Sequence, residues 1–212
     1  MKRTLLILAA IAVIALMVPA AYAQTDDVSI TKHNLGSAGT AVLNDPTLRD
    51  GGGGTDEVCV FCHTPHGGLP DVPLWNHTLS GATYTQYTST TMDMAYANAG
   101  NGLNGGQGVS NMCLSCHDGT VAMNNLVNQP APAAANAVAM TALSGAAFLD
   151  TLLNNDHPVA ILYDPLLDTA FQPQATAELA GINFGDEGGN PTVECGSCHN
   201  PHEAAPALTP FL

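Results

Sequence analysis

All six cysteines of this chain lie in three copies of one short pattern, and no other feature constrains it as strongly. The pattern is Cys-x-x-Cys-His, and its copies span 59–63, 113–117 and 195–199. In a helical turn, residues i and i+3 share a face, so both sulfurs can reach the two vinyl groups at one porphyrin edge. The following histidine then projects its imidazole toward the iron, as in covalent attachment of haem c. We therefore expect three haem c groups, attached through Cys59, Cys62, Cys113, Cys116, Cys195 and Cys198, with His63, His117 and His199 as proximal iron ligands.

Three other uses of paired cysteines compete with haem attachment. Six cysteines in an exported chain could form disulfides, three Cys-x-x-Cys pairs could bind zinc, and each pair could be a thioredoxin-like redox motif. Each of these leaves unexplained why histidine follows the second cysteine in all three copies. The sequence therefore favours haem over all of them.

The N-terminus has the pattern of a secretory signal peptide. Lys2 and Arg3 precede an apolar run over 5–18, and Ala21-Tyr22-Ala23 forms a small-x-small cleavage site. We expect cleavage after residue 23, because the apolar run is short for a membrane span. The predicted mature protein is one triheme domain, 24–212, located in the periplasm or outside the cell, with no membrane association after cleavage.

The predicted mature chain is strongly acidic. Lys32 and Arg49 are its only fixed cations against 18 Asp and Glu residues, so two minus 18 gives a net charge of −16. This charge excludes electrostatic binding to nucleic acid and disfavours anionic membranes. We expect the partners to be other redox proteins with basic docking surfaces.

Beyond the three proximal residues the chain has five more histidines, and three irons with two axial ligands each need only three. The distal candidates are His33, His66, His157 and His202, with His77 a weaker candidate because it equally fits a structural histidine beside Trp75. Met112 and Met123 fit core packing better than ligation. Histidines in excess indicate six-coordinate irons closed to substrates, and hence an electron-transfer protein rather than an enzyme.

Two of the distal candidates belong to a repeat. Cys62-His63-Thr64-Pro65-His66 matches Cys198-His199-Asn200-Pro201-His202, whereas His117 is followed by Asp118-Gly119-Thr120. The proline ends the motif helix and makes the residue before it extended. Three residues reach at most about 10 Å, which is short for passing round a porphyrin to its far face. We therefore expect His66 and His202 to serve haems other than the one their own motif holds.

The composition predicts a mostly irregular chain with short α-helices and few short strands, organised around three covalently bound haems. Aromatic residues are scarce, at 5%, so a core made of protein alone would be thin. Helical spacing indicates a short helix over 175–180 that Gly181 ends. A short strand is expected over 159–163, and Leu143, Ala147, Phe148 and Leu152 fit one helix face.

The chain resembles the doubled-CXXCH, cytochrome c3-like family of exported multihaem cytochromes. The resemblance lies in these motifs and in three further segments: Lys32-His33-Asn34-Leu35, Pro73-Leu74-Trp75-Asn76 and Asp156-His157-Pro158-Val159. The resemblance implies bis-histidine haems in a closely stacked chain that carries electrons. It is also compatible with self-association into conductive extracellular filaments. The alternative is a multihaem reductase, which needs one iron with an open coordination position.

Overall fold

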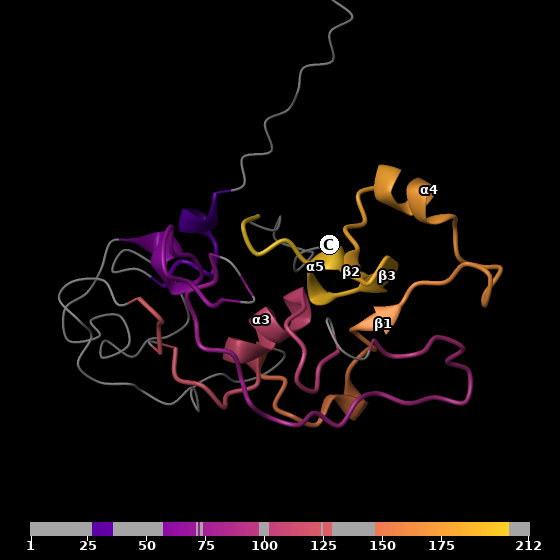
Figure 1. Cartoon of the computed structure of the whole chain (residues 1–212), viewed down its shortest axis with the longest axis horizontal. Helices are drawn as coiled ribbons and strands as arrows, with labels where there is room; N and C mark the ends of the chain where they lie inside the picture. The colour runs from indigo at the N-terminus through magenta and orange to yellow at the C-terminus, as the bar shows by residue number, and fades with distance from the viewer. Residues whose placement is uncertain are drawn as a thin grey trace, which may run out of the picture.

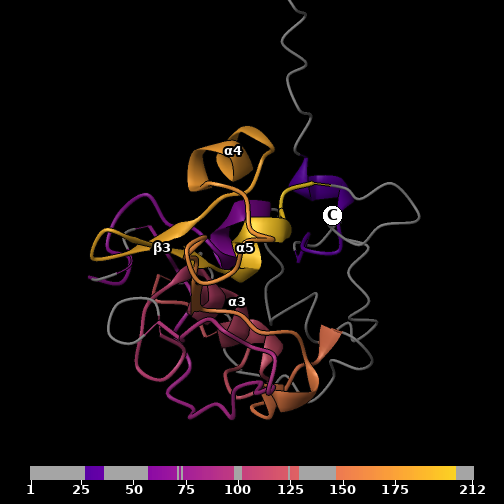
Figure 2. The ribbon, with the colours of Figure 1, turned by 90° about the vertical axis from the view of Figure 1, so that its right-hand side faces the viewer.

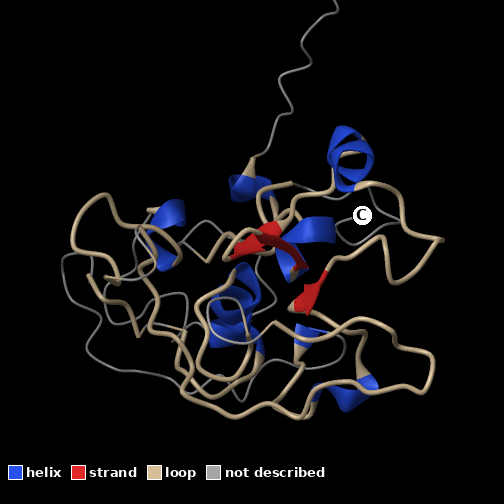
Figure 3. Cartoon of the chain, turned by 45° about the vertical axis from the view of Figure 1, so that its right-hand side comes forward, coloured by secondary structure: helices blue, strands red, loops and turns tan. Residues whose placement is uncertain are grey.

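The computed structural model describes residues 27–35, 57–70, 72, 74–97, 102–123, 125–128 and 147–203. Within these ranges the chain is mostly loops and turns, joined by short helices and one small sheet (Figure 3). The predicted signal peptide, 1–23, lies outside the described residues. Long loops around so few regular elements leave little protein to form a core by itself.

The helices are short. The described residues form three 3-10 helices and three α-helices: η1 (Val28–Ile30), η2 (Val58–Phe61), η4 (Leu153–Asn155), α3 (Val109–His117), α4 (Gln174–Leu179) and α5 (Cys195–Cys198). The prediction of a short helix over 175–180 is confirmed by α4. Gly181 follows it with φ 97°, and the Ile182 amide donates to the Ala177 carbonyl at 3.1 Å. Glycine adopts this left-handed conformation without strain, which is why the helix ends there.

One antiparallel sheet holds the C-terminal part together. Its strands are β1 (Ile161–Leu162), β2 (Gly185–Glu187) and β3 (Asn190–Val193), in the spatial order β1-β3-β2. The strand expected over 159–163 is confirmed only for Ile161–Leu162, which form β1, because Ala160 has φ 56° and leaves the extended conformation. Gly188 and Gly189, with φ 62° and 90°, make the two-residue turn between β2 and β3. Two positive φ values in succession match the twist of a hairpin, and β3 leads directly into α5.

The predicted helix face over 143–152 is wrong in its described part, 147–152, which forms no α-helix. The Leu149 amide donates to the His117 carbonyl at 3.0 Å instead of to its own segment. The ring of Phe148 packs over Gly119. This segment, 147–152, which we call the strap, therefore covers the end of α3. Leu143 lies outside the described residues.

The buried apolar core is small and sits beside α3. It consists of Tyr84, Leu103, Leu114, Leu153, Val159 and Ala160, with Cys195 packed at its edge. In Figure 1, α3 occupies the centre with α5 packed against it, β2 and β3 lie beside α5, and α4 stands apart at one side. Figures 1 and 2 both show the end of the described chain, near residue 203, beside the 27–35 segment. Segments from both ends of the chain thus meet around α3.

Candidate haem-binding site

Each Cys-x-x-Cys-His copy begins as a helical turn. The His63 amide donates to the Cys59 carbonyl at 2.8 Å, and the His199 amide donates to the Cys195 carbonyl at 2.9 Å. The middle copy forms the end of α3, which closes on His117. The turns place both sulfurs of a copy on one face, which is the geometry that attachment to one porphyrin edge requires.

The cysteine alternatives find no support in this geometry. All six cysteines are free thiols in this structure. Within the described ranges, no group of three or more His, Cys, Asp or Glu side chains could hold a metal ion, which a zinc site would need. Burial raises the pKa of Cys62 to about 11 and that of Cys116 to about 12. The hydrogen bond with Cys113 lowers the pKa of Cys195 instead, so thiol protonation does not distinguish between the uses of the cysteines.

A second histidine faces each proximal histidine. The ring centroids of His63 and His202 are 6.1 Å apart, with planes at 18°. Those of His199 and His157 are 6.4 Å apart, with planes at 21°. For His117 and His33 the separation is 6.1 Å and the planes are at 72°. The three proximal histidines are thus matched one to one with three residues from distant parts of the sequence.

These separations fit an iron between each pair. An imidazole nitrogen lies about 2 Å from a bound metal ion and about 1.2 Å from its own ring centre, so two trans imidazoles on one iron have centroids about 6.4 Å apart. Packed ring pairs in general have centroids about 4.5–7 Å apart, and His63 also lies 6.1 Å from Trp75, so the distance alone does not identify an iron; the distinguishing feature is that each proximal histidine faces another imidazole. The three observed values, 6.1, 6.1 and 6.4 Å, agree with the spacing for an iron ligated on both sides.

The ring protonation also suits ligation. His117 Nδ1 lies 2.7 Å from the Ala147 carbonyl oxygen and donates to it, which leaves Nε2 as the nitrogen that can face a metal ion. Burial lowers the pKa of His63, with a smaller effect from His202, and burial likewise lowers the pKa of His199, with smaller effects from His157 and His117. Both effects favour the neutral imidazole, which is the form that binds a metal.

His202 reaches the first motif because the chain leaves α5 in an extended conformation. His199, the residue after α5, has φ −108° and ψ 121°. Pro201 prevents a return to helix, and the His202 amide donates to the Asn200 side chain at 3.1 Å. The ring therefore lies against His63 rather than against its own His199.

His66, the equivalent residue in the first motif, is placed differently. Its side chain is exposed, and it makes no ring contact with a proximal histidine in the described part of the chain. Its carbonyl oxygen accepts hydrogen bonds from Thr64 Oγ1 and Asn128 Nδ2, both at 2.8 Å. Hydrogen bonds therefore fix the backbone of His66, but in the described part of the chain no proximal histidine faces its ring.

His77 is fully buried, and within the described residues its ring makes no contact with the imidazole pairs. Nε2 lies 2.9 Å from the Ala122 carbonyl oxygen, and Nδ1 lies 3.1 Å from both Ser115 Oγ and the Thr78 carbonyl oxygen. Both ring nitrogens thus have protein partners. The arrangement favours the structural reading of His77 over ligation.

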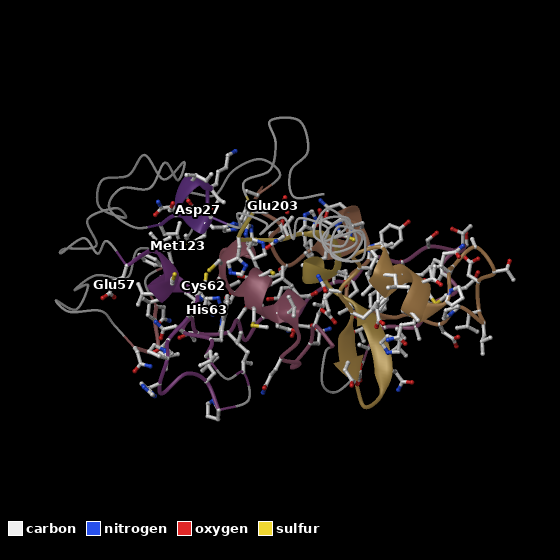
Figure 4. All side chains as sticks on the ribbon, turned by 90° about the horizontal axis from the view of Figure 1, so that it is seen from above. Asp27, Glu57, Cys62, His63, Met123 and Glu203 are labelled. Atoms are coloured by element: carbon white, nitrogen blue, oxygen red, sulfur yellow. The ribbon has the colours of Figure 1, made fainter. Side chains whose placement is uncertain are left out.

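The dipeptide Asn76-His77 joins the first two motifs. The Asn76 side chain donates to the Val60 carbonyl at 2.6 Å, and its amide donates to the Cys62 carbonyl at 2.9 Å. The neighbouring His77 contacts Ser115, which lies inside the second motif. Figure 4 shows Cys62 and His63 on the side of η2 that faces α3. One buried dipeptide therefore fixes the spacing between the two attachment turns.

A second connection joins the second and third motifs. Glu194 Oε2 accepts from the Ser110 amide at 3.2 Å and from the Ser110 hydroxyl, and Ser110 Oγ accepts from the Cys195 amide at 3.1 Å. A Cβ on Gly196 would lie 2.9 Å from Val109 Cγ1, so the glycine permits the close approach of α3 and α5. Cys113 and Cys195 are in side-chain contact at this junction.

The middle motif lacks Pro-His and ends in a different turn. Asp118 is buried and accepts hydrogen bonds from the Thr120 amide at 2.8 Å and from the Tyr84 hydroxyl at 2.6 Å. Gly119 has φ 68°, and a Cβ there would lie 2.5 Å from the Phe148 ring. The turn thereby allows the 147–152 strap to reach His117. The imidazole that faces His117 comes instead from the N-terminal segment, as His33.

Sequence reasoning missed the residues that join the motifs. Asn76, Ser110, Tyr84 and Glu194 are all buried, but nothing in their sequence surroundings marks them as contacts between motifs. Glu194 directly precedes Cys195, and this position is the one signal that could have drawn attention to it. Met123 is buried, as expected for core packing.

The comparisons give no family assignment. No protein-family model matches the chain, and no curated protein matches it. No helix in the described ranges is both long and apolar enough to cross a membrane.

Proposed function

We propose that this chain is an exported electron-transfer protein that binds three haem c groups, each with two axial histidines. The axial pairs are His63 with His202, His117 with His33, and His199 with His157. The observation that carries the proposal is the set of three imidazole pairs with centroids 6.1–6.4 Å apart, each containing the histidine of one attachment motif. Each bound haem would supply a reversible one-electron couple, at the low potential typical of bis-histidine ligation.

The pairs support electron transfer over catalysis. A reductase needs a coordination position that its substrate can occupy, and in this arrangement every proximal histidine already faces a second imidazole. The protein then has to hold the ligands in place and exclude competing ones. The hydrogen bond from His117 Nδ1 to the Ala147 carbonyl does this for the middle pair by fixing the ring orientation.

The middle motif lies next to both others. His33, of the middle pair, is close enough to His202 for that residue to lower its pKa, after the larger effects of burial and His117. The pKa of His199 is in turn lowered by burial and by its neighbours His157 and His117. We therefore propose a row in chain order, in which electrons pass one at a time from a reduced donor protein to an oxidised acceptor protein.

Location and partners follow from charge and the predicted signal. The net charge of −16 expected for 24–212 favours docking to basic surfaces of redox partners in the periplasm or outside the cell. Self-association into a conductive filament remains part of the proposal. With all three pairs formed inside one chain, such a filament would not need a histidine from a neighbouring subunit. Electron micrographs of purified protein and sheared cell surfaces would test it.

Production in a host that attaches haem c tests the function directly. The mature protein should carry three covalent haems by intact mass and by pyridine haemochrome absorbance, and its ferric spectra should be entirely low-spin. His202→Ala should open one iron and create one high-spin haem. His66→Ala is the matched control, because it occupies the equivalent place in the repeated motif and should change nothing.

Two results would overturn the proposal. Fewer than three covalent haems would show that the motifs do not all function in attachment. A high-spin haem in the unmodified protein, or binding of nitrite or another small anion to its iron, would favour the reductase.

A further inference from the structure

Glu194 is a buried carboxylate between two attachment motifs. It is 3% exposed and directly precedes Cys195 at the start of α5. Oε2 accepts from the amide and the hydroxyl of Ser110, in the first turn of α3. Oε1 is buried as well and has no hydrogen-bond partner. A buried carboxylate oxygen without a partner lowers the stability of the fold, because burial removes the water that would bind it and no protein donor takes the place of that water.

Among the described residues, no basic side chain compensates this charge. Lys32 is the only lysine or arginine among the described residues; it is exposed, and no ion pair to Glu194 is formed within the described ranges. The titratable neighbours of Glu194 are Cys195, whose thiol feels its charge, and Cys113, which contacts Cys195. Both cysteines are attachment points in the proposed function, so the carboxylate lies close to two of the three proposed haems.

We propose that the Glu194 carboxylate tunes the reduction potentials of the second and third haems, by favouring their oxidised state. The inference rests on the proposed function. An oxidised bis-histidine haem carries one positive charge more than the reduced form, so a nearby negative charge stabilises it. The effect is strong where water is excluded, because the effective dielectric constant is low. Ser110 supplies two donors that hold the carboxylate at this position, and the Ser197 amide of the α5 capping box supplies a third.

A purely structural role makes a different prediction. Glu194 also joins α3 to α5 and donates its amide to Ser197 Oγ at 2.9 Å. If joining the helices were its whole role, loss of Ser110 Oγ would have the same consequences as loss of the charge. If the charge matters, only the change at Glu194 shifts the potentials upward.

The test is a spectroelectrochemical titration of the holoprotein and three variants. Glu194→Gln keeps the size and an acceptor oxygen but removes the charge. The two affected haems should then become easier to reduce, by about tenfold in the ratio of reduced to oxidised form at fixed potential, which is about 59 mV for a one-electron couple. The haem attached through Cys59 and Cys62 should shift less.

Two variants serve as controls. Glu178→Gln makes the same chemical change on the exposed face of α4 and should leave all three potentials unchanged. Ser110→Ala weakens the junction but keeps the charge, so it should give no upward shift. No shift in Glu194→Gln, or an equal upward shift in Ser110→Ala, overturns the inference.

A further measurement applies if Glu194→Gln yields no holoprotein. Infrared difference spectra of the unmodified protein, with its glutamates labelled by carbon-13, should show a carboxylate band that shifts on haem reduction and moves in Ser110→Ala. Absence of that band overturns the inference. Haem content separates the two proposals: three low-spin haems with potentials insensitive to Glu194 would refute this inference alone, whereas missing haems would refute the proposed function.

Discussion

Replacement of His77 by alanine should destabilise the protein strongly and leave its irons unaffected. The side chain is fully buried, and its ring nitrogens contact Ala122, Thr78 and Ser115. A typical hydrogen bond contributes about 1 kcal/mol net, and a large-to-small substitution in a core costs about 2–5 kcal/mol. We therefore expect His77→Ala to lower the free energy of unfolding by about 4 kcal/mol. Guanidinium unfolding of the holoprotein, followed by far-UV circular dichroism, measures this.

The same variant separates the two roles that the sequence left open for His77. If it only positions the first two motifs, all three haems of His77→Ala stay low-spin in the ferric spectrum. His66→Ala, which removes an exposed imidazole, should change stability by at most about 0.5 kcal/mol. A new high-spin signal in His77→Ala, or a stability equal to that of the unmodified protein, would refute the reasoning.

Three more expectations follow from the described contacts. Gly119→Ala should cost about 2 kcal/mol of unfolding free energy, because φ is 68° and the new Cβ would lie 2.5 Å from Phe148; adding Phe148→Ala should recover part of it. Tyr84→Phe should cost about 1–3 kcal/mol, because it removes the donor to buried Asp118, and a loss below 0.5 kcal/mol would count against that hydrogen bond. Burial lowers the pKa of His77, so below about pH 6.5 the unfolded chain binds more protons than the folded one, and the free energy of unfolding falls as the pH falls. This pH dependence should be shallower in His77→Ala. Denaturant titrations at several pH values measure it.

The local structure of the attachment motifs could be predicted because it follows from spacing alone. Cys-x-x-Cys-His fixes which residues share a helical face, and the turns at Cys59 and Cys195 have that form. The short helix α4 was likewise marked by a glycine at its end. Such features depend on a few neighbouring residues, and sequence patterns record them directly.

The pairing of histidines could not be predicted, because it depends on contacts between distant segments. His66 and His202 have the same local pattern, yet only His202 lies against a proximal histidine. The difference lies in where each motif sits: α5 is fixed to α3 through Glu194 and Ser110, which carries the following turn toward His63. The 147–152 strap shows the same limit, since His117 and Gly119, not its own apolar spacing, determine its path.

An experimental structure of the haem-loaded protein tests the central claim most directly. The proposal predicts that each iron lies between the Nε2 atoms of one pair: His63 and His202, His117 and His33, His199 and His157. An iron ligated by His66, His77 or a methionine, or an iron with one open position, would contradict it.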